Sequence, residues 1–268
     1  MSDRLIELVT ACYGMIFLTI IELTGKPCMR VLVISDIHSN LTALESVLDD
    51  AGPFDAAWCL GDLVGYGPDP NECIEAVRRL PNLSCVIGNH DAAVLGQLDL
   101  ESFNRDARLA VEWTQDNLTL ENFAFLGSLP EKVQVDSNVT LAHGSPRNPI
   151  WEYLLDSYTA LENFKHFDTR YCFIGHTHLP VAFLSQNGSS DLEWKISYNG
   201  KLGDRAILNP GSVGQPRDHN PLAAYAIYDT ETTTWEPHRV DYNIPAVQQR
   251  ITMTGLPRRH AVRLEDGW

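Results

Sequence analysis

The chain has 268 residues, of which 44% are hydrophobic, so it is long enough to bury a core in one large domain of helices and strands. Its formal net charge of −15 repels polyanions, which argues against a general nucleic-acid-binding function. The six cysteines form no CxxC pair, and three of them lie in apolar strand-like runs, as is typical of reduced core residues in a cytoplasmic protein.

The N-terminus predicts an extension, residues 1–28, that precedes a single domain at residues 29–268. Its apolar segment, residues 11–21, has only about half of the roughly 20 residues that a membrane-spanning helix needs. The start MSDR is not the positively charged beginning of a signal peptide. We therefore expect no membrane partner, and a membrane or protein anchor in this extension is the alternative.

The first part of the domain predicts alternating strands and helices. A continuous apolar run at residues 31–34 is typical of a strand buried on both faces, and Asn40 is a suitable cap for a helix that follows it. A strand at 57–60, a helix at 71–80 and a strand at 85–87 repeat this unit. The βαβαβ order favours a layered α/β fold.

The second part of the domain changes from helices to strands. Residues 104–128 predict one or two helices, with Asn104 and Thr119 as caps. Gly255 and Pro257 are expected to end a last helix that closes the chain at residues 244–254. Between them the sequence predicts one helix at 158–167 and strands at 133–135, 139–142, 171–174, 181–184, 206–208, 223–228 and 235–240.

Five short polar clusters follow hydrophobic runs. They are SDIHSN (35–40), LGDLVGYG (60–67), IGNHD (87–91), LAHG (141–144) and IGHTH (174–178). Because α/β sheets gather their sites at the ends of strands, we expect the clusters to meet. Together they supply oxygen and imidazole groups that divalent transition metals favour, namely Asp36, His38, Asp62, Asn89, His90, His143, His176 and His178. The sequence therefore predicts a dinuclear metal site.

The chemistry of these groups favours phosphoester hydrolysis. The carboxylate of Asp62 has two oxygens with several lone pairs and can bridge two ions. Asn89 offers a neutral amide oxygen, and His90 beside it is available for proton transfer. Two ions about 3.5 to 4 Å apart polarise a phosphoryl group and hold a hydroxide at neutral pH.

The order and spacing of the clusters resemble the calcineurin-like metallophosphoesterase superfamily, from residue 29 to about residue 241. Two further stretches, HGSPRNPIWEYLL (143–155) and NPGSVGQPRD (209–218), resemble its small prokaryotic phosphodiesterase branch, some of whose members hydrolyse diadenosine polyphosphates. The resemblance implies an α/β fold in four layers, with two mixed β-sheets face to face, flanked by α-helices, and the metal site at the strand ends.

The resemblance also implies a role for each candidate. A metal-bridging hydroxide attacks phosphorus, and His90 contacts the scissile phosphate and acts as the general acid for the leaving group. Manganese is the expected metal, with iron, nickel, cobalt and zinc as alternatives. The implied ligands are Asp36, His38, Asp62 and His178 for the first ion, and Asp62, Asn89, His143 and His176 for the second.

One stretch departs from a well-known part of the superfamily. Protein serine/threonine phosphatases carry GDxVDRG, whereas this chain has GDLVGYG, with Gly65 and Tyr66 at the changed positions. This argues against a protein phosphatase and favours small phosphodiesters, phosphomonoesters or nucleotide polyphosphates. Arg147 and Arg217 are candidate phosphate contacts because guanidinium offers bidentate donors, and a surface salt bridge is the alternative for each.

Other assignments stay open at this point. Asp91 either orients His90 or caps the following helix, and the basic run at residues 258–260 is expected to be a solvated surface. A catalytically silent scaffold and a nuclease of the same superfamily are the alternative functions. The sequence leaves the physiological substrate and the oligomeric state open. The histidines expected outside the site are His166, His219, His238 and His260, and His219 is left open because it follows the 209–218 loop.

Overall fold

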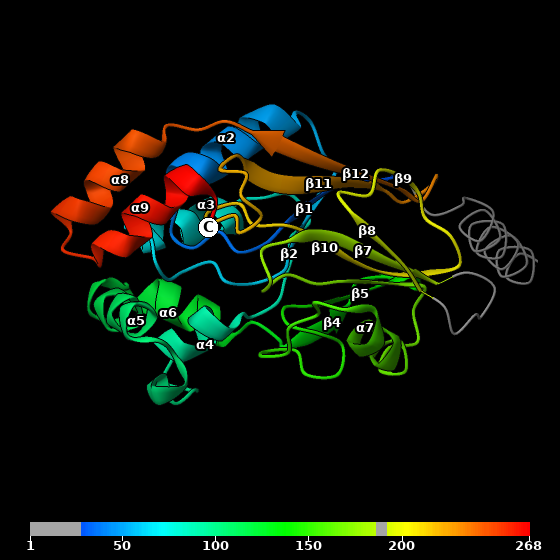
Figure 1. Cartoon of the computed structure of the whole chain (residues 1–268), viewed down its shortest axis with the longest axis horizontal. Helices are drawn as coiled ribbons and strands as arrows, with labels where there is room; N and C mark the ends of the chain where they lie inside the picture. Colours follow the sequence, from blue (N-terminus) through cyan, green and yellow to red (C-terminus); the bar gives the residue numbers. More distant parts are fainter. Residues whose placement is uncertain (1–27, 186–191) are drawn as a thin grey trace, which may run out of the picture.

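Two six-stranded sheets pack face to face in the computed structural model, which describes residues 28–185 and 192–268 (Figure 1). Among these residues the strands are β1 (Arg30–Ile34), β2 (Ala56–Cys59), β3 (Ser84–Cys85), β4 (Lys132–Gln134), β5 (Val139–Ala142), β6 (Tyr171–Phe173), β7 (Pro180–Ser185), β8 (Leu192–Ile196), β9 (Gly200–Lys201), β10 (Arg205–Pro210), β11 (Ala223–Asp229) and β12 (Thr234–Val240). The first sheet has the order β3-β2-β1-β11-β12-β9, and the second has β4-β5-β6-β10-β7-β8. Both sheets mix parallel and antiparallel pairs.

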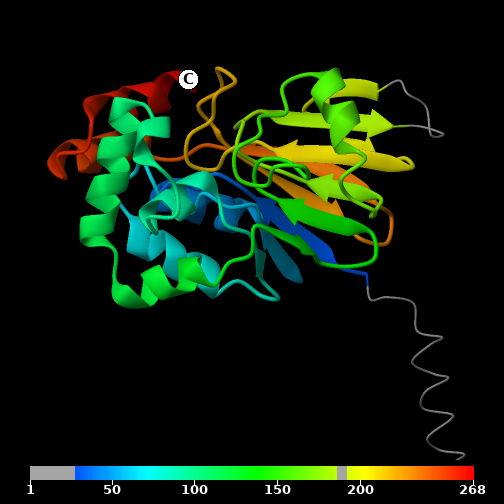
Figure 2. The ribbon, with the colours of Figure 1, turned by 90° about the horizontal axis from the view of Figure 1, so that it is seen from below.

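Helices gather mainly at one end of the two sheets, as Figures 1 and 2 show. The loops at the strand ends lie between these helices and the sheets, and the C-terminus lies beside these loops. The helices are α2 (Leu41–Ala51), α3 (Pro70–Arg78), α4 (Asn89–Val94), α5 (Arg105–Asn117), α6 (Leu120–Gly127), α7 (Ser157–Asn163), α8 (Ile244–Met253) and α9 (Arg258–Asp266), with a short 3₁₀ helix at Leu100–Ser102.

Three apolar clusters define the layers. Alternate residues of a strand point to opposite faces, so Leu32 of β1 packs under the helices whereas Val33 faces the second sheet. The middle cluster joins the sheets through large side chains such as Trp58 and Phe173. The third cluster covers the outer face of the second sheet with residues of α7 and its flanks. These layers confirm the four-layer α/β fold.

Local signals placed several helix starts correctly. Asn40, Asn104 and Thr119 each accept a hydrogen bond from a backbone N–H in the first turn of α2, α5 and α6, respectively. The stretch 104–128 forms two helices because Leu118 takes an extended conformation between them. The helix expected at 158–167 is shorter, since α7 ends at Asn163.

The predicted end of the chain is wrong. Gly255 and Pro257 do not close the chain but form the turn between α8 and α9, with Gly255 at φ +77° and Pro257 in the cap position of α9. The same residue types that end one helix therefore start the next. Buried Val247 of α8 and Leu264 of α9 share one apolar cluster, so the two helices pack as a pair.

The expected extension, residues 1–28, lies outside the described residues apart from Cys28, and so does its apolar segment 11–21. Within the described ranges, no helix is long and apolar enough to cross a membrane.

Candidate metal centre

The carboxyl ends of parallel strands bring the five polar clusters together. β1, β2 and β3 run parallel in the first sheet, and β5 and β6 run parallel in the second. Each cluster begins where one of these strands ends or within a few residues of its end. Loops that are more than 100 residues apart in sequence therefore meet, as when both Asp36 carboxylate oxygens accept the backbone N–H of His176, 140 positions away.

Tight turns aim the candidate ligands at one point. Several of them have a positive φ, a conformation that costs about 1 to 2 kcal/mol per residue for side chains other than glycine. Left-handed residues of this kind concentrate at functional sites, because the surrounding structure must hold them in place. The candidates in this conformation are Asp36, His38, Asp62, His176 and His178, with φ values from +50° to +66°.

The first group of ligand atoms comes from Asp36, His38 and His178, all of them buried. The Nε2 atoms of His38 and His178 are 3.1 Å apart, and Oδ1 of Asp36 is 3.3 Å from Nε2 of His178. The Nδ1 atoms of the two rings face backbone carbonyl oxygens of Val64 and Gln215. A carbonyl only accepts, so Nδ1 carries the proton and both Nε2 lone pairs point at each other.

The second group comes from Asp62, Asn89, His143 and His176. Nε2 of His143 lies 3.3 Å from Oδ2 of Asp62, 3.1 Å from Oδ1 of Asn89 and 3.2 Å from Nδ1 of His176. Nδ1 of His143 is 2.8 Å from the carbonyl oxygen of Leu60, which fixes the same tautomer. Ligand atoms from four side chains therefore converge here, and their mixture of oxygen and imidazole nitrogen suits a divalent cation.

One carboxylate oxygen of Asp62 lies close to both groups of ligand atoms. Its Oδ2 is 3.6 Å from Nε2 of His38 in the first group and 3.3 Å from Nε2 of His143 in the second. Its Oδ1 accepts the backbone N–H of His90 at 2.8 Å, which fixes the carboxylate. The geometry suits a bridging ligand in which Oδ2 faces both positions.

Burial keeps most of these rings neutral. It lowers the pKa of His176 to about 3 and that of His90 to about 4, and it places the pKa values of His38 and His178 well below the usual range. Neutral imidazole is the form that binds metal. His143 differs: burial lowers its pKa, but the charges of Asp62 and Asp36, together with hydrogen bonds to Asp62 and to the Leu60 carbonyl, outweigh burial and raise it to about 9. A metal ion at this position would replace that proton.

Asp36 shows the electrostatic strain of the site. Burial, together with the nearby charge of Asp62, raises the pKa of Asp36 to about 7. Asp62 shows the reverse shift, since His143 and His90 lower its pKa below the ordinary value although burial opposes this. A divalent cation relieves the repulsion between the two carboxylates and favours the charged form of both.

His90 stands against aromatic side chains at the edge of the two groups. Its ring centroid is 4.4 Å from that of Tyr66 and 5.2 Å from that of Phe103, and Nδ1 is buried with no hydrogen-bond partner in the described part of the chain. Asp91 does not orient this ring. Its carboxylate accepts the backbone N–H groups of Val64 and Gly88, so it caps α4 and ties the second cluster to the third.

Replacing Gly65 by alanine is expected to lower phosphoesterase activity without loss of the fold. A Cβ atom there would lie 2.6 Å from Nδ1 of His90, so the ring must move. Gly96→Ala is the matched control, because Gly96 also has a positive φ but a Cβ there meets nothing within 4 Å. Steady-state kinetics and thermal unfolding of both variants test this, and equal activity losses in the two would contradict it.

The two candidate arginines occupy different surroundings. Arg217 donates to Oε1 of Gln215 at 3.1 Å, lies over the Tyr66 ring, and has a buried Nε without a partner among the described residues. Its charge adds to the effect of burial in lowering the pKa of His178 and three other rings of the centre. Arg147 instead forms a bidentate salt bridge with Glu152, the alternative that the sequence left open.

Small structural residues hold the turns in place. Asn209 donates to the carbonyl oxygen of Gly175 at 2.6 Å, and Ser212 donates to that of Asp36 at 2.8 Å. Asn40, besides capping α2, donates to the carbonyl oxygen of Gly214 at 3.0 Å. Hydrogen bonds with the 209–218 loop therefore hold the backbone of the first and last polar clusters in place.

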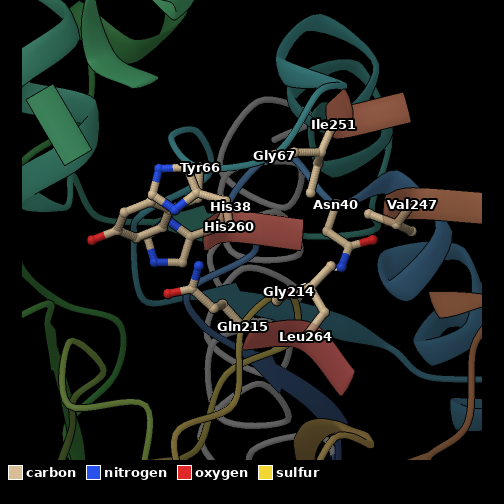
Figure 3. A pocket seen from close by; sticks show the side chains of 10 residues that line it. All are labelled: His38, Asn40, Tyr66, Gly67, Gly214, Gln215, Val247, Ile251, His260 and Leu264. Carbon is tan, nitrogen blue, oxygen red and sulfur yellow. Dashed lines mark hydrogen bonds between the residues drawn. The ribbon is translucent and has the colours of Figure 1, made fainter. Parts of the chain in front are cut away.

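A small cavity of about 10 Å³ is lined by His38 and Tyr66 (Figure 3). His260 of α9 lines it, is 3% exposed and has its ring 4.9 Å from that of Tyr66. The expectation that residues 258–260 are a solvated run is therefore wrong for His260, because α9 turns this residue inward. His219, which was left open, donates its backbone N–H to Gly267 near the end of α9.

The comparisons with known proteins agree with this geometry. The model of the calcineurin-like phosphoesterase superfamily domain matches residues 29–233. The chain belongs to this superfamily. A metallophosphoesterase from Sphaerobacter thermophilus has 44% sequence identity and a TM-score of 0.81, over 90% of this chain and 100% of that one.

Two further proteins have similar sequences. An uncharacterized protein of Methanocaldococcus jannaschii is 40% identical over 240 residues, which is 87% of this chain and 96% of that protein. The symmetrical bis(5'-nucleosyl)-tetraphosphatase of Erwinia tasmaniensis is 41% identical over 71 residues, or 25% of this chain and 26% of that enzyme. Members of the superfamily typically hydrolyse phosphoesters and use divalent metals, and this chain carries candidate ligand clusters of that kind.

Some residues of the site had no signal in the sequence. The ring of Tyr153 packs against that of His176 with centroids 3.9 Å apart and planes tilted by 31°, and Trp151 lies edge-on to the same ring at 6.3 Å. Both belong to the 143–155 stretch, whose resemblance to the phosphodiesterase branch marked the segment without marking these rings. His260 was missed because its helix was missed.

Proposed function

We propose that this chain is a dinuclear-metal-dependent phosphoesterase that hydrolyses small phosphodiesters, phosphomonoesters or nucleotide polyphosphates. The main support is the set of acceptor atoms, in which the Nε2 lone pairs of His38 and His178 face each other at 3.1 Å and demand a cation. When bound, a pair of divalent ions polarises the phosphoryl group and lowers the pKa of water so that it can attack at neutral pH.

Two sets of side chains would hold the two ions. We propose Asp36, His38, Asp62 and His178 as ligands of the first ion, and Asp62, Asn89, His143 and His176 as ligands of the second. Manganese is our first choice, because oxygen ligands accompany the imidazoles. Backbone carbonyls hold the tautomers of His38, His143 and His178, so the Nε2 atoms stay aimed inward.

His90 is the proposed general acid. Burial makes the ring neutral at pH 7, and a negatively charged phosphate raises its affinity for a proton. The ring then donates that proton to the departing oxygen. Arg217 is the proposed phosphate contact, since its charge acts on the histidines of the centre, and its buried Nε has no hydrogen-bond partner among the described residues.

Nucleotides are a plausible class of substrate by chemistry and by likeness. A stretch of 71 residues is 41% identical to a bis(5'-nucleosyl)-tetraphosphatase, and this stretch is the basis for including nucleotide polyphosphates. The catalytically silent scaffold is less well supported. A protein that only bound partners would not need a buried, unpartnered imidazole such as His90 beside the ligand groups.

The test is hydrolysis of 4-nitrophenyl phosphate and its bis ester by the purified chain, with manganese, iron, cobalt, nickel or zinc added separately. Elemental analysis of the same samples gives the metal content. We expect turnover with at least one metal and close to two ions per chain. No turnover with any of them at saturating concentration would exclude the proposal, and absence of bound metal as well would favour the scaffold.

Replacing each candidate arginine by alanine separates their roles. We expect Arg217→Ala to lower kcat/KM about 10- to 100-fold, the loss typical of one charged hydrogen bond to substrate. We expect Arg147→Ala to act mainly on stability. Burial raises the pKa of Glu152, but hydrogen bonds from Arg147, Ser145 and Asn163 outweigh burial and lower this pKa to about 2.

The lowered pKa of Glu152 makes the effect of Arg147→Ala on stability depend on pH. A depressed carboxyl pKa stabilises the folded state above the ordinary value of 4.5, and the stabilisation is lost as pH falls towards 2. Thermal unfolding should therefore differ between wild type and Arg147→Ala at neutral pH and converge in acid. A loss of kcat/KM in Arg147→Ala as large as that in Arg217→Ala would contradict this assignment.

A further inference from the structure

An apolar groove with a volume of about 70 Å³ lies next to the candidate metal centre. Its walls come from the segment before α7, from β7 and from β8, with one carboxylate at its border. The residues that matter here are Leu154, Leu179, Val181, Trp194, Ile196 and Asp218.

The groove lies on the outer face of the second sheet, where side chains of β8 are exposed beside the layer that contains α7. β7 and β8 pair antiparallel, with Phe183 opposite Trp194 and Val181 opposite Ile196. Phe183 is fully buried in the cluster around α7, but Trp194 is 50% exposed and Ile196 is 67% exposed. Two large apolar side chains on an open sheet face are unusual unless something binds there.

Three walls of the groove adjoin residues of the centre. Leu179 follows His178, Asp218 follows Arg217, and Leu154 follows Tyr153, whose ring packs against that of His176. Val181 is three residues beyond His178, which is about 10 Å at the rise of about 3.3 Å per residue in a strand. A group esterified to a phosphate in the centre can therefore reach the groove.

The lining defines the chemistry of that group. Apolar walls with a carboxylate at the border exclude a further phosphate and suit an uncharged group. The half-exposed Trp194 indole offers a flat face for stacking. Oδ2 of Asp218 is paired with Arg239, whereas Oδ1 is buried without a hydrogen-bond partner in the described part of the chain. It can accept from an N–H group on the edge of a ring.

We infer that this groove binds the nucleobase of a nucleoside phosphoester whose phosphate lies in the metal centre. A nucleobase has two faces for stacking and N–H donors at its edge, which match Trp194 and Asp218. The inference rests on the proposed function and deepens it, because it assigns the substrate to the nucleoside phosphoesters.

The test compares two substrates with the same 4-nitrophenolate leaving group, thymidine 5'-(4-nitrophenyl) phosphate and methyl 4-nitrophenyl phosphate. For the wild type loaded with its metal, we expect kcat/KM to be about 10- to 100-fold higher for the thymidine ester, as base stacking implies. Trp194→Ala and Ile196→Lys should each remove most of that ratio. Tyr158→Ala is the control, since Tyr158 is an exposed aromatic residue that does not line the groove.

The possible results distinguish failure of the proposed phosphoesterase function from failure of the nucleobase inference. A wild type that hydrolyses neither of these esters nor 4-nitrophenyl phosphate overturns the proposed function, whereas one that hydrolyses only 4-nitrophenyl phosphate overturns only the nucleobase inference. A wild type that hydrolyses both esters equally, or groove variants that keep the ratio, overturns only the nucleobase inference. A wild-type dimer that Ile196→Lys makes monomeric, with the ratio unchanged, would assign the groove to a second copy of the chain and also overturn it.

Discussion

Replacing Asp62 by asparagine is expected to lower kcat for phosphoester hydrolysis by about 1,000-fold or more. Oδ2 of this residue faces Nε2 of His38 at 3.6 Å and Nε2 of His143 at 3.3 Å, so it is the one carboxylate shared by both groups. An amide at this position removes the negative charge that would hold two cations, and loss of the cations removes the electrostatic stabilisation that they would give to the transition state.

Metal content is the second measurement on this variant. Asp62→Asn should hold fewer than two ions per chain, because neither group is complete without the carboxylate. Asp50→Asn is a suitable control, since Asp50 lies on α2, outside the candidate ligand groups, and accepts a hydrogen bond from Tyr225. If Asp62→Asn kept two ions and wild-type kcat, the assignment of Asp62 as the bridging ligand would have to be abandoned.

Replacing His90 by glutamine is expected to lower kcat about 100- to 10,000-fold on esters with poor leaving groups while metal content is unchanged. A general acid matters most when the departing alkoxide is basic and matters little for 4-nitrophenolate, which leaves without a proton. Kinetics on an alkyl phosphate ester and on a 4-nitrophenyl ester therefore distinguish proton donation from other roles. His166→Gln, an exposed histidine, is the control.

A competing role for His90 makes this measurement decisive. A ligand atom of His90 lies within 4.8 Å of ligand atoms of both His38 and Asp62, so geometry alone also permits metal binding. In that case His90→Gln would lose bound metal and would lose activity equally on both classes of ester. That pattern would exclude His90 as the general acid.

The fold and the centre of the site could be predicted because their signals are local. Each candidate ligand follows an apolar run, and parallel strands carry such ends to one edge of a sheet. Asn40 could be assigned as a cap for the same reason, since a cap depends on three neighbouring residues.

Partners that are distant in the chain could not be predicted. His260 lies against Tyr66 only because α8 and α9 fold back on each other, and Gly255 with Pro257 indicated an end rather than a turn. The ring of Tyr153 reaches His176 through an irregular segment without periodicity. Arg147 could not be assigned between phosphate and salt bridge until the position of Glu152 was known.

The left-handed backbone at the candidate ligands sets a trade-off between durability and activity. Histidine and aspartate are held in a conformation that glycine or asparagine adopts at lower free energy, at five positions within one centre. Selection for stability alone would replace them, and each replacement would remove a ligand. We therefore expect glycine or asparagine at these positions to make the fold more stable and the centre less able to bind metal.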